Sequence, residues 1–418
     1  MSEHEKIYSN SSPEDKELTL AALPSHTHPM LEIVDAMISK DKIKSSVSTA
    51  VTEQDETAFM EMVRTTLLPW QEEQILTVPA VHETQTEIMA LHWHPEFVPI
   101  PLVRQRMAKM FPNAEEEICI PTQHNQLLSI DGYAGVEVDC YSSAFNLKVQ
   151  LLCHFKTSRL EQAHTFKNML GHTASYRSSQ LYLLLNTLAS ALQKNKAHQL
   201  VQKVVRDNGF EHTEVEFTAR LAAKLTALID KYHHAIDPGC FKNKMVRDML
   251  DAQHGLYDKI LIGKAQAYAR EIKREVKNIF PTGYYYKTEE IIEETRSLGG
   301  AVIIPHPEEF WPILLADYDV DGYEVWNPQS RQYTEFLISV LTRQNQRRGR
   351  RRKKILLCMG DDCHLSEKVK PISRQDPQKA SREVGLQSAW NYPAVKEKLR
   401  RGKSRRGEVI AEYRARIA

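Results

Sequence analysis

The chain has 418 residues, of which 42% are hydrophobic and 26% are charged, and this composition excludes the collagen-like and disordered classes. No stretch approaches 18 consecutive apolar residues, and the six cysteines form no CxxC pair, so we expect a cytoplasmic protein with reduced thiols and no membrane partner. The net charge of +1 conceals an asymmetry, because residues 1–87 hold 16 acidic and 6 basic side chains, whereas residues 343–418 hold 22 basic and 8 acidic ones.

Residues 1–87 form an acidic N-terminal extension that we expect to be helical. Ser12 and Pro13 supply an N-cap and a proline at the first helical position, and Glu14 and Asp15 place carboxylates in the first turn. The segment offers no catalytic pattern, so we interpret it as a candidate surface for a protein partner.

A different pattern begins at residue 88, where short apolar runs recur and end in polar residues, mostly histidine or a carboxylate. The runs are 88–94, 118–124, 136–139, 149–154, 301–306, 322–327 and 355–362. Apolar runs of this length predict strands buried on both faces, and helices between many of them are typical of a mostly parallel α/β barrel. In such barrels the chemistry lies at the carboxyl ends of the strands, which is where these polar residues fall.

A long helical segment interrupts the barrel pattern over residues 156–287. It divides the predicted barrel into a first part, 88–155, and a second part, 288–370, and a basic helical tail follows over 371–418. The segment shows helical spacing at Phe217, Leu221, Leu225, Leu228 and Tyr232. We interpret it as an inserted cap or a partner-binding subdomain.

Metal-ligand residue types gather at the predicted strand ends. On an extended strand, side chains two residues apart point the same way, so His92 and His94 can face one ion, and Asp362 and His364 repeat this spacing. An anionic and a neutral ligand together suit a divalent cation. Four more residues of metal-ligating types lie on other predicted strands: His124, Glu137, His154 and His306.

In this order and context the motifs resemble the polymerase and histidinol phosphatase (PHP) superfamily of metal-dependent phosphoesterases, from about residue 88 to 370. The opening Asp-Leu-His-x-His of the family appears here as Ala90-Leu91-His92-Trp93-His94, and Thr-Asp-His-Asn as Thr122-Gln123-His124-Asn125. Further matches are Glu137, His154, Gly299-Gly300 through His306-Pro307, Asp321-Gly322-Tyr323-Glu324-Val325-Trp326-Asn327, and Gly360-Asp361-Asp362-Cys363-His364. The resemblance implies a distorted seven-stranded (β/α) barrel with a large helical insertion and helical N- and C-terminal extensions.

The resemblance also implies two to three divalent ions, of manganese, zinc or iron. One ion would take His92, His94, Glu137 and Asp362; a second would share Glu137 and add His154 and His306; a third would keep His124 and His364. Ala90, Gln123 and Ile100 depart from the family pattern, and Ile100 stands where a further ligand is common. Glu96 is the candidate that could replace that ligand.

The expected activity is hydrolysis of a phosphoester by a metal-activated hydroxide, with Asp362, His364 and Glu137 as the central catalytic residues. Nucleotides or nucleic acid are the favoured substrates. A small-molecule phosphatase of the histidinol-phosphatase type is one alternative. A catalytically weak metal-binding subunit that acts through a protein partner is the other, because Ala90, Gln123 and Ile100 depart from the family pattern.

Basic residues supply candidate phosphate contacts. Arg104 and Arg106 follow the first metal-ligand strand on a predicted helix. The densest basic run, 343–354, contains Arg350, Arg351 and Arg352, and with the tail it could bind nucleic acid through the C-terminal region.

Overall fold

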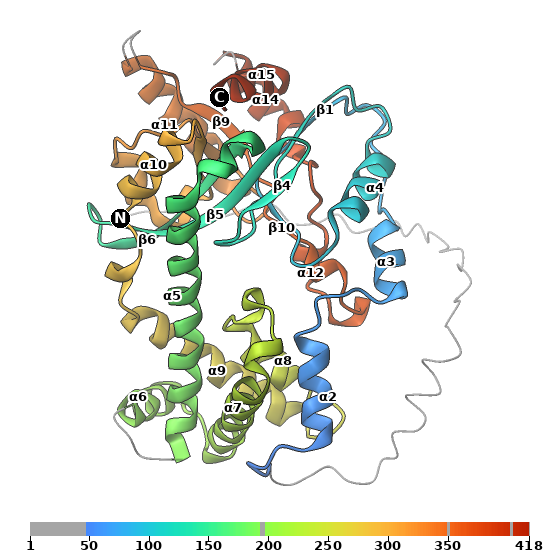
Figure 1. The fold of residues 1–418 in the computed structure, drawn as a ribbon, viewed down its shortest axis with the longest axis vertical. Helices are drawn as coiled ribbons and strands as arrows, with labels where there is room; N and C mark the ends of the chain where they lie inside the picture. Colours follow the sequence, from blue (N-terminus) through green and yellow to red (C-terminus); the bar gives the residue numbers. More distant parts are fainter. Residues whose placement is uncertain (1–46, 193–196, 349–351, 402–403, 418) are drawn as a thin grey trace, which may run out of the picture.

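The computed structural model describes residues 47–192, 197–348, 352–401 and 404–417, so the helix start predicted at Ser12 lies outside the described residues. Figure 1 shows a β-rich body from which a group of long helices extends. The strands are β1 (Glu87–Ala90), β2 (Trp93–His94), β3 (Glu116–Cys119), β4 (Leu128–Ile130), β5 (Tyr133–Ser142), β6 (Leu147–Lys156), β7 (Ala301–Ile304), β8 (Gly322–Trp326), β9 (Leu356–Met359) and β10 (Cys363–His364).

The described helices alternate with these strands only in part. Those of the β-rich body are α3 (Pro69–Leu76), α4 (Ile100–Met110), α10 (Thr288–Ser297), α11 (Thr334–Arg347), α12 (Leu365–Lys368), α13 (Pro377–Ala380), α14 (Pro393–Arg401) and α15 (Arg406–Arg416). Those of the extending group are α2 (Glu53–Met62), α5 (His164–Ala189), α6 (His198–Asn208), α7 (His212–Tyr232), α8 (Lys244–Asp251) and α9 (Lys259–Ile279). None of the described helices is both long and apolar enough to cross a membrane.

Six strands form one mixed sheet in the order β4-β5-β6-β7-β8-β9, and two parallel pairs, β1-β3 and β2-β10, lie outside it. The pairs β7-β8 and β8-β9 are parallel, whereas the pairs β4-β5, β5-β6 and β6-β7 are antiparallel. The expected parallel arrangement therefore fails for β5 and β6. Only residues 143–146 connect these two strands, and a parallel crossover needs about a dozen residues or more. A closed seven-stranded barrel stays a prediction.

The extending helices have a hydrophobic core of their own. Leu221, Leu225 and Leu228 of α7 are buried there, as their spacing predicts, together with Tyr268 of α9 and Phe59 of α2. Helix α2 is tied to this group by a buried ion pair, in which Lys224 Nζ lies 2.6 Å from Asp55 Oδ2. At least part of the acidic N-terminal segment thus packs against the chain's own helices.

The C-terminal helix α15 packs against β1, β3 and β9 (Figure 1). Tyr413 is fully buried in the main core, and Val409 and Ile410 line the same helix face. Arg406 donates to the Glu87 carbonyl oxygen, and Arg416 donates to the Asp321 carbonyl oxygen. The segment predicted as a basic tail is therefore built into the body of the protein.

Candidate metal centre

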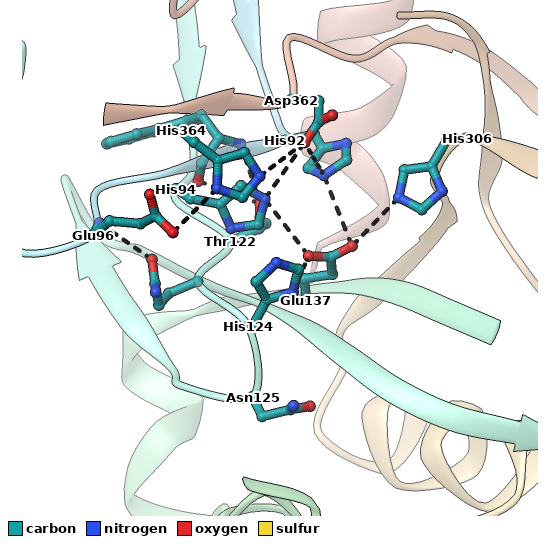
Figure 2. Close-up of polar contacts among 12 residues, drawn as sticks. His92, His94, Glu96, Thr122, His124, Asn125, Glu137, His306, Asp362 and His364 are labelled. Carbon is teal, nitrogen blue, oxygen red and sulfur yellow. Dashed lines mark hydrogen bonds and ion pairs between the residues drawn. The ribbon is translucent and has the colours of Figure 1, made fainter. Parts of the chain in front are cut away.

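Two short strands bring two of the predicted ligands into register. His94 of β2 is the parallel partner of His364 of β10, and their rings stack with centroids 4.2 Å apart. His92 precedes β2, and alternation along the extended chain turns its ring to the same side as His94, while Trp93 between them is buried in a separate apolar cluster. The structure thus brings both His-x-His and Asp-x-His spacings to one place, as Figure 2 shows.

Glu137 lies at the centre of this group, with a different histidine pair at each carboxylate oxygen. Oε1 is 3.8 Å from His92 Nε2 and 3.5 Å from His306 Nε2. Oε2 is 3.5 Å from His94 Nε2 and 2.5 Å from His124 Nδ1 (Figure 2). Glu137 sits in the middle of β5, not at a strand end, because the antiparallel β5–β6 hairpin crosses the site.

Asp362 faces the same group from the turn before β10. Its Oδ1 lies 3.7 Å from His92 Nε2, 3.9 Å from His94 Nε2 and 3.3 Å from His364 Nε2. Its Oδ2 accepts hydrogen bonds of 2.6 Å from both Arg382 and Gln329. Asp362 and His306 have φ of +42° and +26°, a region in which non-glycine residues are uncommon and cost about 1 kcal/mol or more, so the fold holds both in strained positions.

The donor set fits divalent ions. Two overlapping groups have ligand atoms within 4.8 Å of one another: His92, His94 and Glu137, and His94, His124 and His364. Two ligands bonded at about 2.1 Å to one tetrahedral ion lie ~3.4 Å apart, close to most of the separations above. Nε2 of His94 is also buried without a hydrogen-bond partner, and a buried imidazole nitrogen without a partner is costly unless an ion satisfies it.

Electrostatics keep the carboxylates charged. Burial raises the pKa of Glu137, but the surrounding imidazoles outweigh that effect and hold it well below its usual range. Burial lowers the pKa of His94, and the neighbouring His364 and His124 lower it further, so His94 presents a neutral ring that can bind a cation. Burial also lowers the pKa of His306, yet its hydrogen bond to Glu137 and the charges of Glu309 and Glu137 raise it to about 9.

Glu324 supports two of the ligands from behind. Its Oε1 lies 2.8 Å from His92 Nδ1, and its Oε2 accepts a 3.0 Å hydrogen bond from the His306 backbone N–H. Burial lowers the pKa of His92, but the Glu324 charge and hydrogen bond raise it to about 10. A Cβ on Gly360 would overlap the Glu324 carboxylate, so glycine leaves the space that this carboxylate occupies. Glu324 thereby fixes the ring orientation that points His92 Nε2 toward Glu137 and Asp362.

Glu96 takes a similar position beside His364. Its Oε1 is 3.2 Å from His364 Nδ1, and the Ser366 hydroxyl donates to its Oε2. Burial raises the pKa of Glu96, but the His364 hydrogen bond holds it well below its usual range. Glu96 therefore reaches the group through His364, in a geometry that suits an orienting partner rather than a direct ligand.

His154, the remaining predicted ligand, contacts Tyr413 of the C-terminal helix α15. It is buried in β6, its Nδ1 lies 2.5 Å from the Tyr413 hydroxyl, and its Nε2 has no hydrogen-bond partner. Burial lowers its pKa to about 3, so the ring is neutral. Among the described residues, His154 belongs to neither group of clustered ligand atoms.

The predicted phosphate contacts have other partners. The Arg106 guanidinium is buried and binds Glu383, with its two oxygens at 2.7 and 2.8 Å, so it is not accessible to a substrate phosphate. Arg104 forms ion pairs with Glu117 and Asp131. Arg352 pairs with Asp317 at 2.6 Å, while Arg350 and Arg351 lie outside the described residues.

Three residues that support the ligands, Gln329, Arg382 and Tyr413, were missed by sequence reasoning. The first two hold Asp362, and the third holds His154. None stands beside a ligand in the chain, and Tyr413 lies 259 positions from His154. Only the apolar spacing of Val409, Ile410 and Tyr413 could have signalled that α15 packs inward.

Comparison with known proteins identifies no family. No family model matches the chain, and no curated protein matches it. Among solved structures, one from Bifidobacterium adolescentis described as a "putative metal-dependent phosphoesterase" is similar at 17% identity, over 69% of this chain and 87% of that chain, with a TM-score of 0.32. A TM-score this low does not establish a common fold.

Proposed function

We propose that this chain is a divalent-metal-dependent phosphoesterase, and that the PHP resemblance of its motifs reflects this activity. The supporting observation is the ligand group around Glu137. Four histidines, His92, His94, His124 and His306, lie within 3.8 Å of the Glu137 carboxylate. Asp362 Oδ1 lies within 3.9 Å of His92, His94 and His364. When bound there, divalent cations lower the pKa of water to near neutrality and offset the charge that develops on a phosphoester.

The geometry favours two ions rather than three. Glu137 Oε1 with His92 and His306 would hold one, and Glu137 Oε2 with His94 and His124 would hold the other. Asp362 Oδ1 faces both sets, and His364 Nε2 joins it on the His94 side. This division differs from the one implied by the family pattern by placing His94 with His124, whose ring centroids lie 4.5 Å apart, although the ligand atoms of His92, His94 and Glu137 also lie within 4.8 Å of one another.

Other residues of the chain orient the ligand side chains. Arg382 and Gln329 hold Asp362 Oδ2, so Oδ1 stays aimed at the histidines. Glu324 and Glu96 each turn one imidazole by binding its Nδ1. These supports hold the ligands in place before a substrate arrives, so little reorganisation is needed.

The test is hydrolysis of bis-p-nitrophenyl phosphate and p-nitrophenyl phosphate by the manganese-loaded protein. Asp362→Ala and His306→Ala should each lower kcat/KM more than about 100-fold, because loss of an orienting partner alone costs about 10- to 100-fold. Chelation should abolish activity. Glu335→Gln, at an exposed residue on α11 whose carboxylate pairs with Lys398, is the matched control and should change nothing. Undiminished turnover in both ligand variants would refute the proposal.

The small-molecule phosphatase and the non-enzymatic metal-binding subunit make different predictions in the same assay. The first predicts turnover of the monoester with little of the diester. The second predicts metal binding without turnover of either.

A further inference from the structure

The metal ligands differ in how closely the β-rich body encloses them. The His92, His94 and Glu137 side chains are at most 1% exposed, whereas that of His124 is 15% exposed and that of His364 is 28% exposed. The last two, here called the open-side histidines, have the least packing around their rings. Specific contacts must therefore hold them in place.

Asn125 holds the turn that carries His124. Its backbone N–H donates a 2.7 Å hydrogen bond to the Glu137 carbonyl oxygen, and its φ is +53°, a conformation that asparagine tolerates better than most residues. Its side chain is bound to Asp139 at both ends, because Nδ2 donates to Asp139 Oδ2 and Oδ1 accepts from the Asp139 backbone N–H, each at 2.9 Å. Asp139 therefore fixes the turn from which His124 reaches Glu137.

Asp139 is fully buried, and one of its two cations comes from the extending helices. Arg177 Nη1, on α5, lies 2.9 Å from Asp139 Oδ2, the same oxygen that Asn125 binds. Lys148 Nζ, on β6, lies 2.5 Å from the other oxygen, Oδ1. Arg177 thus joins the extending helices to the turn that holds His124.

His364 has a corresponding connection. Lys242, in the loop before α8, has its Nζ 3.8 Å from Glu96 Oε1, and the same oxygen lies 3.2 Å from His364 Nδ1. The preceding turn of that loop packs against Phe97, since a Cβ on Gly239 would lie 3.4 Å from Phe97 Cζ. Glu96 and Phe97 have φ of +47° and +75°, which is uncommon for side chains of this size, so these contacts help to retain a strained turn.

We propose that Arg177 and Lys242 are positioning residues, through which the extending helices hold the two open-side histidines at one divalent ion. In each case the helices supply the cation, and a carboxylate of the β-rich body connects it to the ligand. The helices thus complete the metal centre, and a change that displaces them should release this ion first. This inference rests on the proposed metal-dependent function and names what retains one of its ions.

The test variants remove the two cations without leaving a buried carboxylate unpaired. Arg177→Met leaves Asp139 with Lys148, and Lys242→Met leaves Glu96 beside its histidine. Both variants are therefore expected to fold, which circular dichroism of the metal-free proteins checks.

The two substitutions are combined in the full-length, metal-stripped protein, which is titrated calorimetrically with manganese. Two Kd values are fitted, and His124→Ala identifies the one that belongs to the open-side ion. We expect this Kd to rise about tenfold, the lower end of the range for an orienting partner, and the other Kd to stay within about twofold of the parent. Arg177→Lys combined with Lys242→Arg keeps both charges and should restore the open-side Kd to within about threefold.

The matched control removes the same two residue types elsewhere in the extending helices. Arg220 on α7 pairs with Glu216 at 2.6 Å, and Lys264 on α9 pairs with Glu211 at 3.3 Å. Arg220→Met combined with Lys264→Met should leave both Kd values unchanged, because neither cation contacts a carboxylate that binds a ligand.

Hydrogen exchange gives a second measurement that does not depend on activity. If the contacts of Arg177 and Lys242 strengthen metal binding, the metal must stabilise those contacts by the same free energy. Manganese should therefore slow amide exchange in α5 around Arg177 and in the loop that contains Lys242, and the double variant should lose this protection.

The outcomes separate this inference from the proposed function. An open-side Kd within twofold of the parent would overturn the inference, and so would an equal rise of both Kd values, which indicates a general loss of structure. Absence of manganese binding by the parent, or exchange in α5 that manganese does not slow, would also overturn it. If the open-side ion is weakened as expected but neither nitrophenyl substrate is hydrolysed by the unsubstituted protein, only the proposed function fails.

Discussion

Glu324→Gln tests whether metal binding by the ligand group depends on the Glu324 carboxylate that contacts His92. The substitution keeps the size of the side chain but removes the charge that lies 2.8 Å from His92 Nδ1, in a place where Glu324 is 2% exposed. Loss of an orienting carboxylate typically lowers metal affinity about 10- to 100-fold. The expected cost is therefore about 1.4 to 2.7 kcal/mol of binding free energy for the ion near His92.

The assay is calorimetric titration of metal-stripped protein with manganese, at fixed pH, for the parent and the Gln variant. Glu335→Gln makes the same chemical change at an exposed position and should leave every affinity unchanged. Circular dichroism of each metal-free protein checks that the fold survives. Affinity of Glu324→Gln within twofold of the parent, with Asp362→Ala still defective, would show that Glu324 does not orient a ligand.

Three further predictions follow from buried contacts. Glu96→Ala should weaken one ion about 10- to 100-fold without changing the number of ions bound at saturation, as elemental analysis would show; loss of a whole ion would make Glu96 a direct ligand. Gly360→Ala should lower metal affinity at least as much as Glu324→Gln, because the added methyl displaces the Glu324 carboxylate; unchanged titration curves would contradict this. Lys224→Met should destabilise the protein by about 3 kcal/mol at pH 7 by leaving Asp55 buried and unpaired. Although burial raises the pKa of Asp55, the hydrogen bond and charge of Lys224 and the hydrogen bonds of Thr52 lower it overall, so the pair stabilises above the unfolded pKa of about 3.9 and is lost as pH falls through the lower folded value. Denaturant unfolding of parent and variant from pH 7 to 3 should therefore show a shrinking difference, and a constant difference would contradict the assignment.

Local spacing in the sequence was sufficient to predict those parts of the site that depend on a single strand. The alternation of an extended chain puts His92 and His94 on one side, whatever the rest of the fold does. The three- to four-residue spacing of Leu221, Leu225 and Leu228 likewise predicts a buried helix face, and α7 has one. These inferences hold because they rest on geometry within a single element.

The number of residues between two predicted strands also limits how those strands can pair, and the strand patterns alone do not include this limit. The nine residues between Asp139 and Val149 are too few for a helical crossover, so β5 and β6 had to form a hairpin. That hairpin puts Glu137 in the middle of a strand and places it between two pairs of histidines.

Only the tertiary structure decided which distant residues complete the site. Glu324 lies 232 positions from His92, and no local spacing links the two. The roles of arginines were equally invisible: Arg106 binds Glu383 in the core, Arg382 holds Asp362, and Arg177 pairs with Asp139. A charged side chain has the same local signature in each setting. Which carboxylate it meets is determined by how helices and strands pack, and that depends on the whole chain.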